Sequence, residues 1–410
     1  MTRILVVGAG FAGAVHAREL ADAGIEVDVI DQRDHIGGNA HDAICATGQR
    51  VHRYGPHLFH TNNEAVMRWI ERFAAFVPYQ HRVQALLADG RRVPLPVNRT
   101  TINTVFGVRL ADEAAVRDFL ASRAEPHAAP VNAADHLYAT IGRVLTDLFF
   151  RPYTRKMWAL DVEDMDAAVV QRIPIRFDDE DRYFPTDRFQ MLPRDGYANL
   201  FGAMLDHPRI RVTLRQAFDQ PVRAGFAHCF NSMPIDEFFA CRFGPLPYRS
   251  IRFHHVARPL LSHVGVSHVG VSHAGMSHPA TPPQGESNPS AAATLNFTDD
   301  GPITRETDWS ALPAQPTPIG AMTTLTREEP CDYLANDRER YYPVKTSDGR
   351  YQAVYARYKA LADATPGVSF IGRCGTYQYL DMHQVINQSL THVRAWLRGQ
   401  LGSAAGSRAA

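Results

Sequence analysis

The sequence has no excess of charge of either sign. Its 43 lysines and arginines are matched by 43 aspartates and glutamates in 410 residues, so its formal net charge is zero. A neutral chain has no overall attraction for polyanions, so we expect neither nucleic acid nor a membrane surface as a partner. Apolar runs are also short, and none approaches the roughly 20 residues that cross a bilayer.

Cysteine is scarce, and its spacing argues against a disulfide or zinc framework. The cysteines lie far apart and form no CxxC pair: Cys45, Cys229, Cys241, Cys331 and Cys374. Such scattered thiols are typical of a reducing compartment. The N-terminal apolar run is interrupted by glycines and by Arg18 and Glu19, unlike a signal peptide. We therefore expect a cytoplasmic protein.

Two segments have little sequence complexity. Residues 262–290 repeat a five-residue unit with a histidine in each copy, and then become rich in proline and serine. A period of five fits neither a helix nor a strand, so we interpret this segment as a surface insert and expect no metal site in it. Residues 402–410 are small and polar, which predicts a loose tail.

The chain begins with the pattern of a parallel βαβ unit. An apolar, β-branched run at residues 4–7 predicts a buried strand, residues 14–23 predict a helix, and residues 27–30 predict a second strand. Over the whole sequence, hydrophobic residues at 45% and charged residues at 21% are ordinary fractions for a folded protein. The length favours two to three domains.

Further elements suggest a discontinuous α/β domain with insertions. Apolar residues three and four apart predict helices at 112–123 and 132–148, with Asp112 and Asn132 as N-caps. Strands are predicted at 85–96, 226–231 and 248–256. The chain closes with a helix at 353–364, a strand at 368–371 and a final helix at 382–401.

A dinucleotide fingerprint, Gly8-x-Gly10-x-x-Gly13, joins the first strand to the first helix. The first glycine permits the tight turn, the second lets the backbone approach a pyrophosphate, and the third lets helix and strand pack closely. The helix N-terminus offers free N–H groups to the phosphates. Asp31 ends the second strand, where a carboxylate accepts hydrogen bonds from a ribose.

A second glycine pair, Gly37 and Gly38, follows soon after Asp31. This arrangement resembles the extended FAD-binding pattern of the glutathione-reductase and amine-oxidase flavoproteins. We therefore prefer FAD over NAD as the cofactor.

Six further motifs extend over nearly the whole chain. They are residues 51–61 (VHRYGPHLFHT), 149–158 (FFRPYTRKMW), 172–177 (RIPIRF), 183–184 (YF), 341–343 (YYP) and 372–382 (GRCGTYQYLDM). Together they closely resemble bacterial UDP-galactopyranose mutase. The resemblance implies a Rossmann-like FAD-binding domain with a helical insertion and a mostly antiparallel sheet domain. It also implies a homodimer that makes UDP-galactofuranose for cell-surface glycans.

The resemblance implies an isomerase that works only with reduced FAD and makes no net redox change. Flavin N5 would attack the anomeric carbon and expel UDP, and the sugar ring would reclose through another hydroxyl. Arg172 and Arg305 would clamp the diphosphate, because guanidinium binds phosphate oxygens bidentately. Phe149 and Tyr153 would contact uracil, and Trp158 would lie near the sugar.

The implied site residues fall into three groups. The catalytic group is Arg172, Arg305, His57, Tyr342, Tyr379 and Asp381. The cofactor group is Gly8, Gly10, Phe11, Gly13, Asp31, Gln32, Gly38, Asn39, His57, His60, Arg373, Asp381 and Met382. The substrate group is Phe149, Tyr153, Thr154, Trp158, Arg172, Tyr183, Phe184, Arg249, Asn296, Arg305, Tyr342 and Tyr379.

The predicted domains interleave along the chain. The FAD-binding domain is expected at 1–78, 193–235 and 350–401. A helical domain is expected at 103–170, with a mobile lid near 158–176. The sheet and substrate domain would take 79–102, 171–192 and 236–349.

Three positions depart from the family pattern. His81 stands where Asn is usual, Met233 replaces a usual Gly, and Trp309 falls in a stretch that is usually Glu-His-Lys. These departures leave other hypotheses open. The protein could be a mutase for another nucleotide sugar such as UDP-N-acetylgalactosamine, a net oxidoreductase of the amine-oxidase type, or a degenerate paralogue that binds without turnover.

Overall fold

The computed structural model describes residues 3–125, 130–171, 173–259 and 292–406. The predicted insert at 262–290 and the implied diphosphate ligand Arg172 lie outside these residues.

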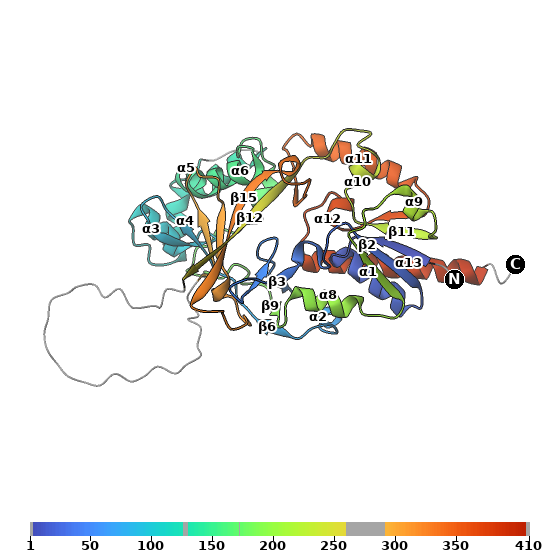
Figure 1. Cartoon of the computed structure of the whole chain (residues 1–410). Helices are drawn as coiled ribbons and strands as arrows, with labels where there is room; N and C mark the ends of the chain where they lie inside the picture. The colour runs from blue at the N-terminus through green and yellow to red at the C-terminus, as the bar shows by residue number, and fades with distance from the viewer. Residues whose placement is uncertain (1–2, 126–129, 172, 260–291, 407–410) are drawn as a thin grey trace.

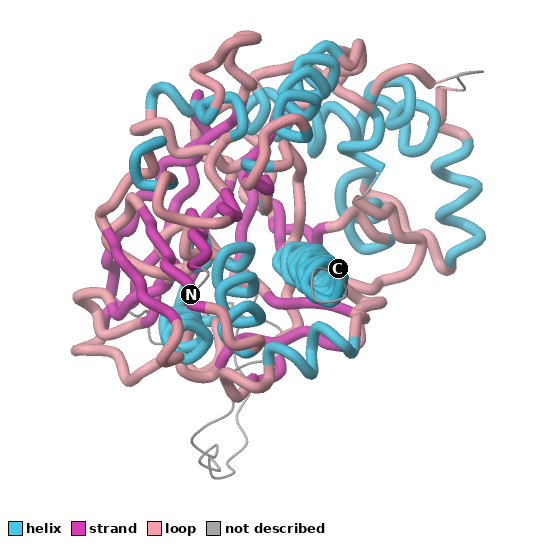
Figure 2. The backbone as a smooth tube through the Cα atoms, turned by 90° about the vertical axis from the view of Figure 1, so that its right-hand side faces the viewer, coloured by secondary structure: helices cyan, strands magenta, loops and turns pink. Residues whose placement is uncertain are grey.

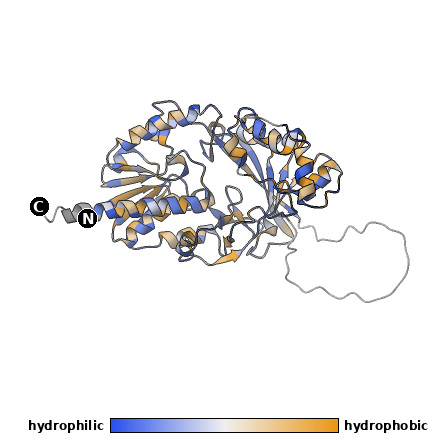
Figure 3. Cartoon of the chain, turned by 180° about the vertical axis from the view of Figure 1, so that it is seen from behind, coloured by the Kyte–Doolittle hydropathy of each residue, from blue (hydrophilic) through white to orange (hydrophobic). Residues whose placement is uncertain are grey.

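Five parallel strands form the first sheet, which lies at one end of the molecule (Figure 1). Their order is β10 (Ile210–Leu214), β2 (Glu26–Asp31), β1 (Arg3–Val7), β11 (His228–Asn231) and β17 (Val368–Phe370). Strands β1 and β2 are buried along almost their whole length, as expected for a sheet that helices cover on both faces. Figure 3 shows these strands as hydrophobic ribbons between the helices.

Helices pack on both faces of the parallel sheet. One face is covered by α1 (Phe11–Asp22), which packs in turn on α8 (Tyr197–Leu205) and α13 (Met382–Gly406). The shorter helices α9 (Gln220–Arg223) and α10 (Ile235–Phe238) and the longer α11 (Arg350–Asp363) lie on the other side, where α11 contacts β17. Helix α13 runs along the molecule, and Figure 2 views it nearly end-on beside the C mark.

A seven-stranded, mostly antiparallel sheet forms the second layer. Its order is β16 (Tyr342–Pro343), β12 (Tyr248–Pro259), β15 (Met322–Asp332), β14 (Arg305–Asp308), β13 (Thr294–Phe297), β7 (Val83–Leu86) and β8 (Arg92–Leu95). Only the β13–β7 pair is parallel among the described strands of this sheet. The predicted fold class is confirmed.

A helical layer packs on the β7–β8 end of this sheet (Figure 1). It comprises α3 (Arg99–Phe106), α4 (Glu113–Ala121), α5 (Ala133–Leu145), a π-helical turn (Thr146–Phe150), α6 (Arg151–Trp158) and α7 (Ala167–Gln171). The predicted N-caps are confirmed: an Asp112 carboxylate oxygen accepts from the Ala115 N–H and Asn132 Oδ1 from the Asp135 N–H, both at 2.9 Å.

Two helices differ from their predicted bounds. The helix expected at 132–148 is broken at Gly142, whose φ of 73° no ordinary side chain adopts easily, and it continues as the π-helical turn. Residues up to Gly406 continue α13, although a loose tail was expected from 402.

Smaller elements connect the two layers. One two-stranded sheet pairs β3 (Asp42–Ile44) with β4 (Arg50–His52), and a three-stranded sheet has the order β5 (Phe59–Thr61), β9 (Phe189–Pro193) and β6 (Phe76–Pro78). The remaining short helices are α2 (Glu64–Ile70), α12 (Gly372–Gly375), and 3-10 turns at Gly38–Ala40, Trp309–Ala311 and Tyr333–Ala335.

Candidate active site

The first glycine turn is closed so tightly that side chains are excluded from it. A Cβ on Gly13 would lie 1.8 Å from the carbonyl oxygen of Gly8. Gly8 itself has a φ of +98°, and a Cβ there would lie 2.0 Å from Ser232 Oγ. The glycines therefore let strand β1 and helix α1 approach at the distance that the fingerprint requires.

The second glycine pair packs directly on the first turn. The Gly37 N–H donates to the carbonyl of Ala9 at 2.9 Å. A Cβ on Gly38 would lie 3.0 Å from Gly10 Cα. The two loops thus form one continuous backbone cradle beside the N-terminus of α1.

Asp31 lies at this cradle and is held by backbone donors. Its Oδ2 accepts from the Ala9 N–H at 2.8 Å, and its Oδ1 accepts from the Arg33 N–H at 2.9 Å. Each oxygen keeps a further lone pair for a ribose hydroxyl. Helix α1 has no side-chain cap and no acidic residue in its first turn, so the helix N-terminus offers its dipole to a phosphate. These residues fit a dinucleotide.

The other predicted residues of this loop have different surroundings. The Phe11 ring packs in the core against Phe201, with ring centroids 4.5 Å apart. The Gln32 side chain is exposed. Asn39 Oδ1 accepts from Arg33 Nη1 at 2.9 Å, and Arg33 also pairs with Glu339 near β16.

His57 is half-buried and held by the backbone around it. Its Nδ1 donates to the carbonyl of Gly55 at 2.9 Å, and its backbone N–H donates to His52 Nδ1 at 3.0 Å. Burial lowers the pKa of His57 to about 4, and the Arg373 cation acts in the same direction. His57 is thus a neutral imidazole near neutral pH.

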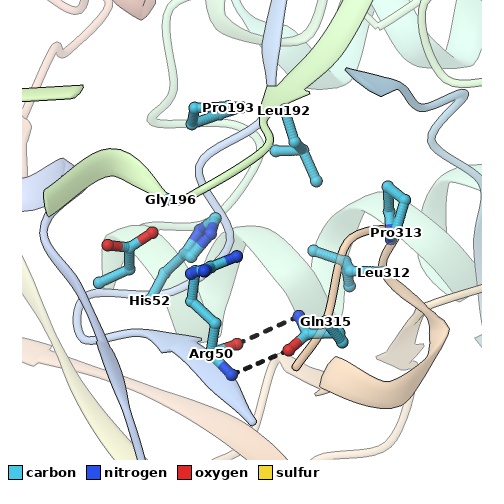
Figure 4. Close-up of a pocket in the computed structure, with 9 residues that line it drawn as sticks. Arg50, His52, Leu192, Pro193, Gly196, Leu312, Pro313 and Gln315 are labelled. Carbon is cyan, nitrogen blue, oxygen red and sulfur yellow. Dashed lines mark hydrogen bonds between the residues drawn. The ribbon is translucent and has the colours of Figure 1, made fainter. Parts of the chain in front are cut away.

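The departure at Trp309 has a structural explanation. Its ring is fully buried, lies 4.8 Å from the ring of His52, and donates from Nε1 to Thr326 Oγ1 at 2.6 Å. Figure 4 shows His52 with Arg50 and Gln315 around a pocket of about 10 Å³, room for about one water. Trp309 therefore supports His52, which in turn holds the backbone of His57.

His60 is fixed by an aromatic ring and a carboxylate. Its ring stacks on Phe184 with centroids 3.6 Å apart and an interplanar angle of 9°. Its Nδ1 donates to Asp187 Oδ2 at 2.5 Å, while Asn62 donates to Oδ1 of the same carboxylate at 2.9 Å. His383 contacts the ring of His60 edge-on.

Arg373 organises two of the predicted tyrosines. The rings of Tyr342 and Tyr379 stack at 5.3 Å, and the guanidinium of Arg373 lies over both. Arg373 also donates to the carbonyl of Tyr341, and its Nε is buried without a partner among the described residues. Asp381 directly precedes α13, whose first residue is Met382.

Arg305 lies at the centre of a polar group on the inner sheet. Its Nη2 donates to the Tyr153 hydroxyl at 3.3 Å. On neighbouring strands it is opposite Asn296 on one side and Glu328 on the other. Arg305 Nε, Asn296 Oδ1 and Glu328 Oε1 are all buried without a hydrogen-bond partner among the described residues. Such a row of unsatisfied groups is typical of a site that a polar ligand completes.

Arg305 keeps its positive charge. Burial alone would lower its pKa, but the Glu328 carboxylate and the Tyr153 and Tyr342 phenols raise it by more, so its pKa lies above the ordinary value. Burial also raises the pKa of Tyr153 and Tyr342, so both keep their hydroxyl protons as donors. The arrangement offers a permanent cation and neutral O–H donors, which suits a diphosphate.

The predicted substrate residues of the helical layer have different surroundings, and Phe149 packs in the core of that layer. Phe149 lies in the π-helical turn, which changes the direction of side chains relative to a regular helix. Trp158 ends α6 and contacts Tyr342 edge-on at 6.0 Å. Thr154 is buried on the same helix. The Arg249 guanidinium donates to backbone carbonyls of α6.

His81 lies beside Arg305 and His60. Its Nδ1 is 3.2 Å from the Tyr79 hydroxyl, and its carbonyl accepts from the Tyr183 N–H at 2.7 Å. Burial lowers the pKa of His81 to about 3, and Arg305 and His60 contribute in the same direction.

Sequence reasoning missed Glu328 and Asp187. Glu328 lies in the run Arg327-Glu328-Glu329, where strand alternation alone distinguishes one buried carboxylate from its more accessible neighbours. Asp187 lies three residues after the Tyr183-Phe184 motif, and this closeness could have marked it as a site residue.

Within the described residues, no group of three or more His, Cys, Asp or Glu side chains is placed to hold a metal ion. No described helix is long and apolar enough to cross a bilayer. The five cysteines are free thiols.

The glycine cradle, Asp31 and the parallel sheet define a dinucleotide-binding protein of the α/β class, and residues 6–73 match the model of the NAD(P)-binding Rossmann-like domain. Residues 148–273 and 283–379 match the UDP-galactopyranose mutase model. The chain belongs to the UDP-galactopyranose mutase family.

Relatives agree with this assignment over almost the full length. The chain is 33% identical to a probable UDP-galactopyranose mutase of Klebsiella pneumoniae, over 94% of this chain and 92% of the relative. It is 31% identical to a dTDP-fucopyranose mutase of Escherichia coli, over 97% and 99%. A UDP-galactopyranose mutase of Mycoplasma pneumoniae is 29% identical over 96% of both chains.

Solved structures of other proteins have the same fold. The structure of a reduced UDP-galactopyranose mutase matches with a TM-score of 0.71 and 17% identity, covering 97% of this chain and 96% of that one. A putrescine oxidase whose cofactor binding was redesigned matches with a TM-score of 0.57 and 12% identity, over 97% and 99%. FAD as the cofactor agrees with this fold and with the dinucleotide-binding domain.

Proposed function

We propose that this protein interconverts UDP-galactopyranose and UDP-galactofuranose with reduced FAD and without net redox change. The observation that carries the proposal is the position of Arg305. A half-buried, permanently charged guanidinium with protonated tyrosines around it fits a nucleoside diphosphate leaving group better than a neutral metabolite.

The cofactor and the protein have separate tasks. When bound, reduced FAD supplies the nucleophile for the anomeric carbon of the sugar. Arg305 stabilises the negative charge that grows on the diphosphate as the glycosidic bond breaks. Arg172, outside the described residues, is proposed as the second cation of this clamp.

The tyrosines serve as donors at fixed positions. Tyr153 already contacts Arg305, and Tyr342 is held between Trp158, Tyr379 and Arg373. Because these hydroxyls are rigid and protonated, they can hold the diphosphate close enough for recapture of the opened sugar.

A second candidate substrate is another nucleotide sugar. The dTDP-fucopyranose mutase of E. coli is nearly as similar to this chain as the K. pneumoniae relative. His81 adds a second reason, because it brings an imidazole where the family pattern has Asn, next to Arg305. UDP-N-acetylgalactosamine belongs to the same group of alternatives.

One experiment separates these functions. The purified protein, with and without reduction by dithionite, is incubated with UDP-galactopyranose and separately with dTDP-fucopyranose. The products are separated by chromatography. We expect UDP-galactofuranose, no oxidised sugar, and no reaction with oxidised FAD. Furanose from dTDP-fucopyranose alone would favour the second substrate. Stoichiometric oxidation of substrate would instead indicate an oxidoreductase, and FAD binding without any product a degenerate paralogue.

We further propose a cytoplasmic homodimer whose product enters cell-surface glycans. The family resemblance and the free cysteines support this proposal. Size-exclusion chromatography with light scattering tests the oligomeric state.

A further inference from the structure

We propose that Arg249 is a positioning residue that fixes the last turn of α6, and with it Trp158, instead of a ligand of the diphosphate. The inference rests on the proposed function, because it assigns a task within that reaction. It differs from the role that the family resemblance implied for this arginine.

The contacts of Arg249 go to the protein backbone. Its Nε donates to the carbonyl of Met157 at 2.7 Å, and its Nη2 donates to the carbonyl of Lys156 at 3.3 Å. These are carbonyls of the final turn of α6, which have no partner within the helix. Arg249 therefore caps α6 from a strand that lies about 90 residues further along the chain.

The charge of Arg249 suits this position. A helix C-terminus carries partial negative charge, so a cation there is stabilised. Among the described residues, Arg249 forms no ion pair, and its guanidinium donates to the α6 carbonyls. Burial lowers its pKa, with Cys331 and Asp332 opposing the change, which agrees with a guanidinium enclosed by protein.

The same turn of α6 is held from its other side by Lys156. The Lys156 ammonium donates to Asp299 Oδ1 at 2.7 Å and to the carbonyls of Phe297 and Ile303 at 3.2 and 3.1 Å. These residues surround the β13–β14 connection, and β14 begins at Arg305. The last turn of α6 is thus fixed between the strand of Arg305 and the strand of Arg249.

Arg249 also fixes the aromatic partner of Trp158. On β12 and β16, Arg249 and Tyr342 are direct cross-strand neighbours, and the Tyr341 N–H donates to the Arg249 carbonyl at 3.0 Å. One residue therefore holds Trp158 through its side chain and Tyr342 through its main chain. This explains how the edge-on contact between Trp158 and Tyr342 is maintained across two elements.

The contacts of Arg249 and Lys156 also affect the turn that follows α6. Ala159 closes α6 in the left-handed conformation, with φ 53° and ψ 33°. That conformation is costly for alanine and requires support from the surrounding structure. Loss of Arg249 is expected to release both the capped carbonyls and the direction in which the chain leaves Trp158.

The test separates a diphosphate ligand from a positioning residue. It uses the FAD-loaded full chain and four variants: Arg249→Met, Arg249→Lys, Trp158→Ala and the double variant Arg249→Met/Trp158→Ala. Arg305→Met serves as the reference for a lost diphosphate ligand. The affinities for UDP and for UDP-galactopyranose are measured on oxidised protein, kcat on reduced protein, and hydrogen exchange on the amides of α6.

We expect Arg249→Met to leave UDP affinity within about twofold while lowering kcat about 10- to 100-fold, because a misplaced Trp158 affects the sugar and not the nucleotide. Arg249→Lys should restore much of kcat, since an ammonium can donate to the same carbonyls. The double variant should be no worse than Trp158→Ala alone, and the α6 amides should exchange faster in Arg249→Met.

The opposite pattern would overturn the proposal. A loss of UDP affinity in Arg249→Met as large as in Arg305→Met would make Arg249 a diphosphate ligand. If the losses of kcat in Arg249→Met and Trp158→Ala add up in the double variant, Arg249 does not act through Trp158. If the wild-type protein fails to isomerise UDP-galactopyranose, the proposed function fails instead. The UDP affinities and the exchange rates of α6 would still decide the role of Arg249.

Discussion

Arg305 and Glu328 face each other on neighbouring strands, with Arg305 Nε 3.8 Å from Glu328 Oε2. Glu328 is 3% exposed, and burial raises the pKa of its carboxyl while Arg305 lowers it. The cation proposed for the diphosphate is therefore shared with a protein carboxylate. The Glu328 carboxylate therefore neutralises part of the positive charge of Arg305 when no substrate is bound.

Replacing Glu328 by Gln is expected to tighten UDP binding. The amide keeps the shape of the side chain but no longer competes for Arg305, so we expect a gain of up to about tenfold, or about 1.4 kcal/mol. Titration calorimetry with UDP measures it. Glu329→Gln is the matched control, because Glu329 pairs with Arg252 and His254 away from Arg305. Weaker UDP binding in Glu328→Gln would show that Glu328 orients Arg305 instead.

Replacing Arg305 by Lys is expected to lower turnover about 100-fold or more, although the charge is retained. An ammonium cannot reproduce the planar fork that binds two phosphate oxygens at once. The rate of furanose formation measures the effect. Arg327→Lys is the control, since Arg327 pairs with Glu306 on the exposed face. Equal turnover in Arg305→Lys and the wild type would refute the clamp.

Replacing Gly38 by Ala is expected to reduce FAD content strongly. The new Cβ would lie 3.0 Å from Gly10 Cα, and the φ of +54° at Gly38 disfavours a side chain, so the two glycine loops must shift away from each other. Flavin absorbance per protein chain in the purified variant measures the loss. Gly202→Ala in α8 is the control, because a Cβ there meets nothing within 4 Å. Full FAD content in Gly38→Ala would contradict the cradle.

Acid is expected to unfold this protein through a buried histidine cluster. His16, His228 and His392 lie together between α1, β11 and α13, and His16 Nε2 is 3.0 Å from His392 Nδ1. Burial lowers the pKa of His16 to about 3 and that of His228 to about 4, from an ordinary value of 6.5. The unfolded chain thus binds protons at higher pH than the folded chain does.

Stability should therefore be independent of these groups above pH 6.5 and fall as the pH drops from 6.5 toward the folded values. Each buried imidazole contributes a slope of about 1.4 kcal/mol per pH unit in that window. Urea unfolding at several pH values measures it. In His228→Asn the slope of stability against pH should be smaller by about 1.4 kcal/mol per pH unit, the contribution of one imidazole. An unchanged slope would show that His228 does not contribute.

Local patterns in the sequence were sufficient for the start of the parallel sheet and for two caps in the helical layer. The glycine fingerprint, the first two strands and the caps Asp112 and Asn132 depend on residues within a few positions of one another. The predicted fold class, family and cofactor agree with the comparisons. The individual site residues remain predictions, tested only by the experiments proposed above.

Contacts between distant segments could not be read from the sequence. Glu328 reaches Arg305 only through the register of β14 and β15, and Arg249 reaches α6 only because β12 passes its C-terminus. The break at Gly142 arises from tertiary packing, since a Cβ there would lie 2.4 Å from the Arg123 carbonyl. The hydrophobic periodicity of a sequence predicts single helices and strands, and it contains no information on contacts between distant elements.

The strand order of the parallel sheet has a consequence for biosynthesis. Strand β1 needs β11 as a neighbour, and β11 needs β17, which the ribosome makes roughly 340 residues after β2. At about 5 to 20 residues per second, the glycine loop waits on the order of 20 to 70 s for the strands that support it. The sheet that supports the glycine loop is therefore complete only after β17 has been made.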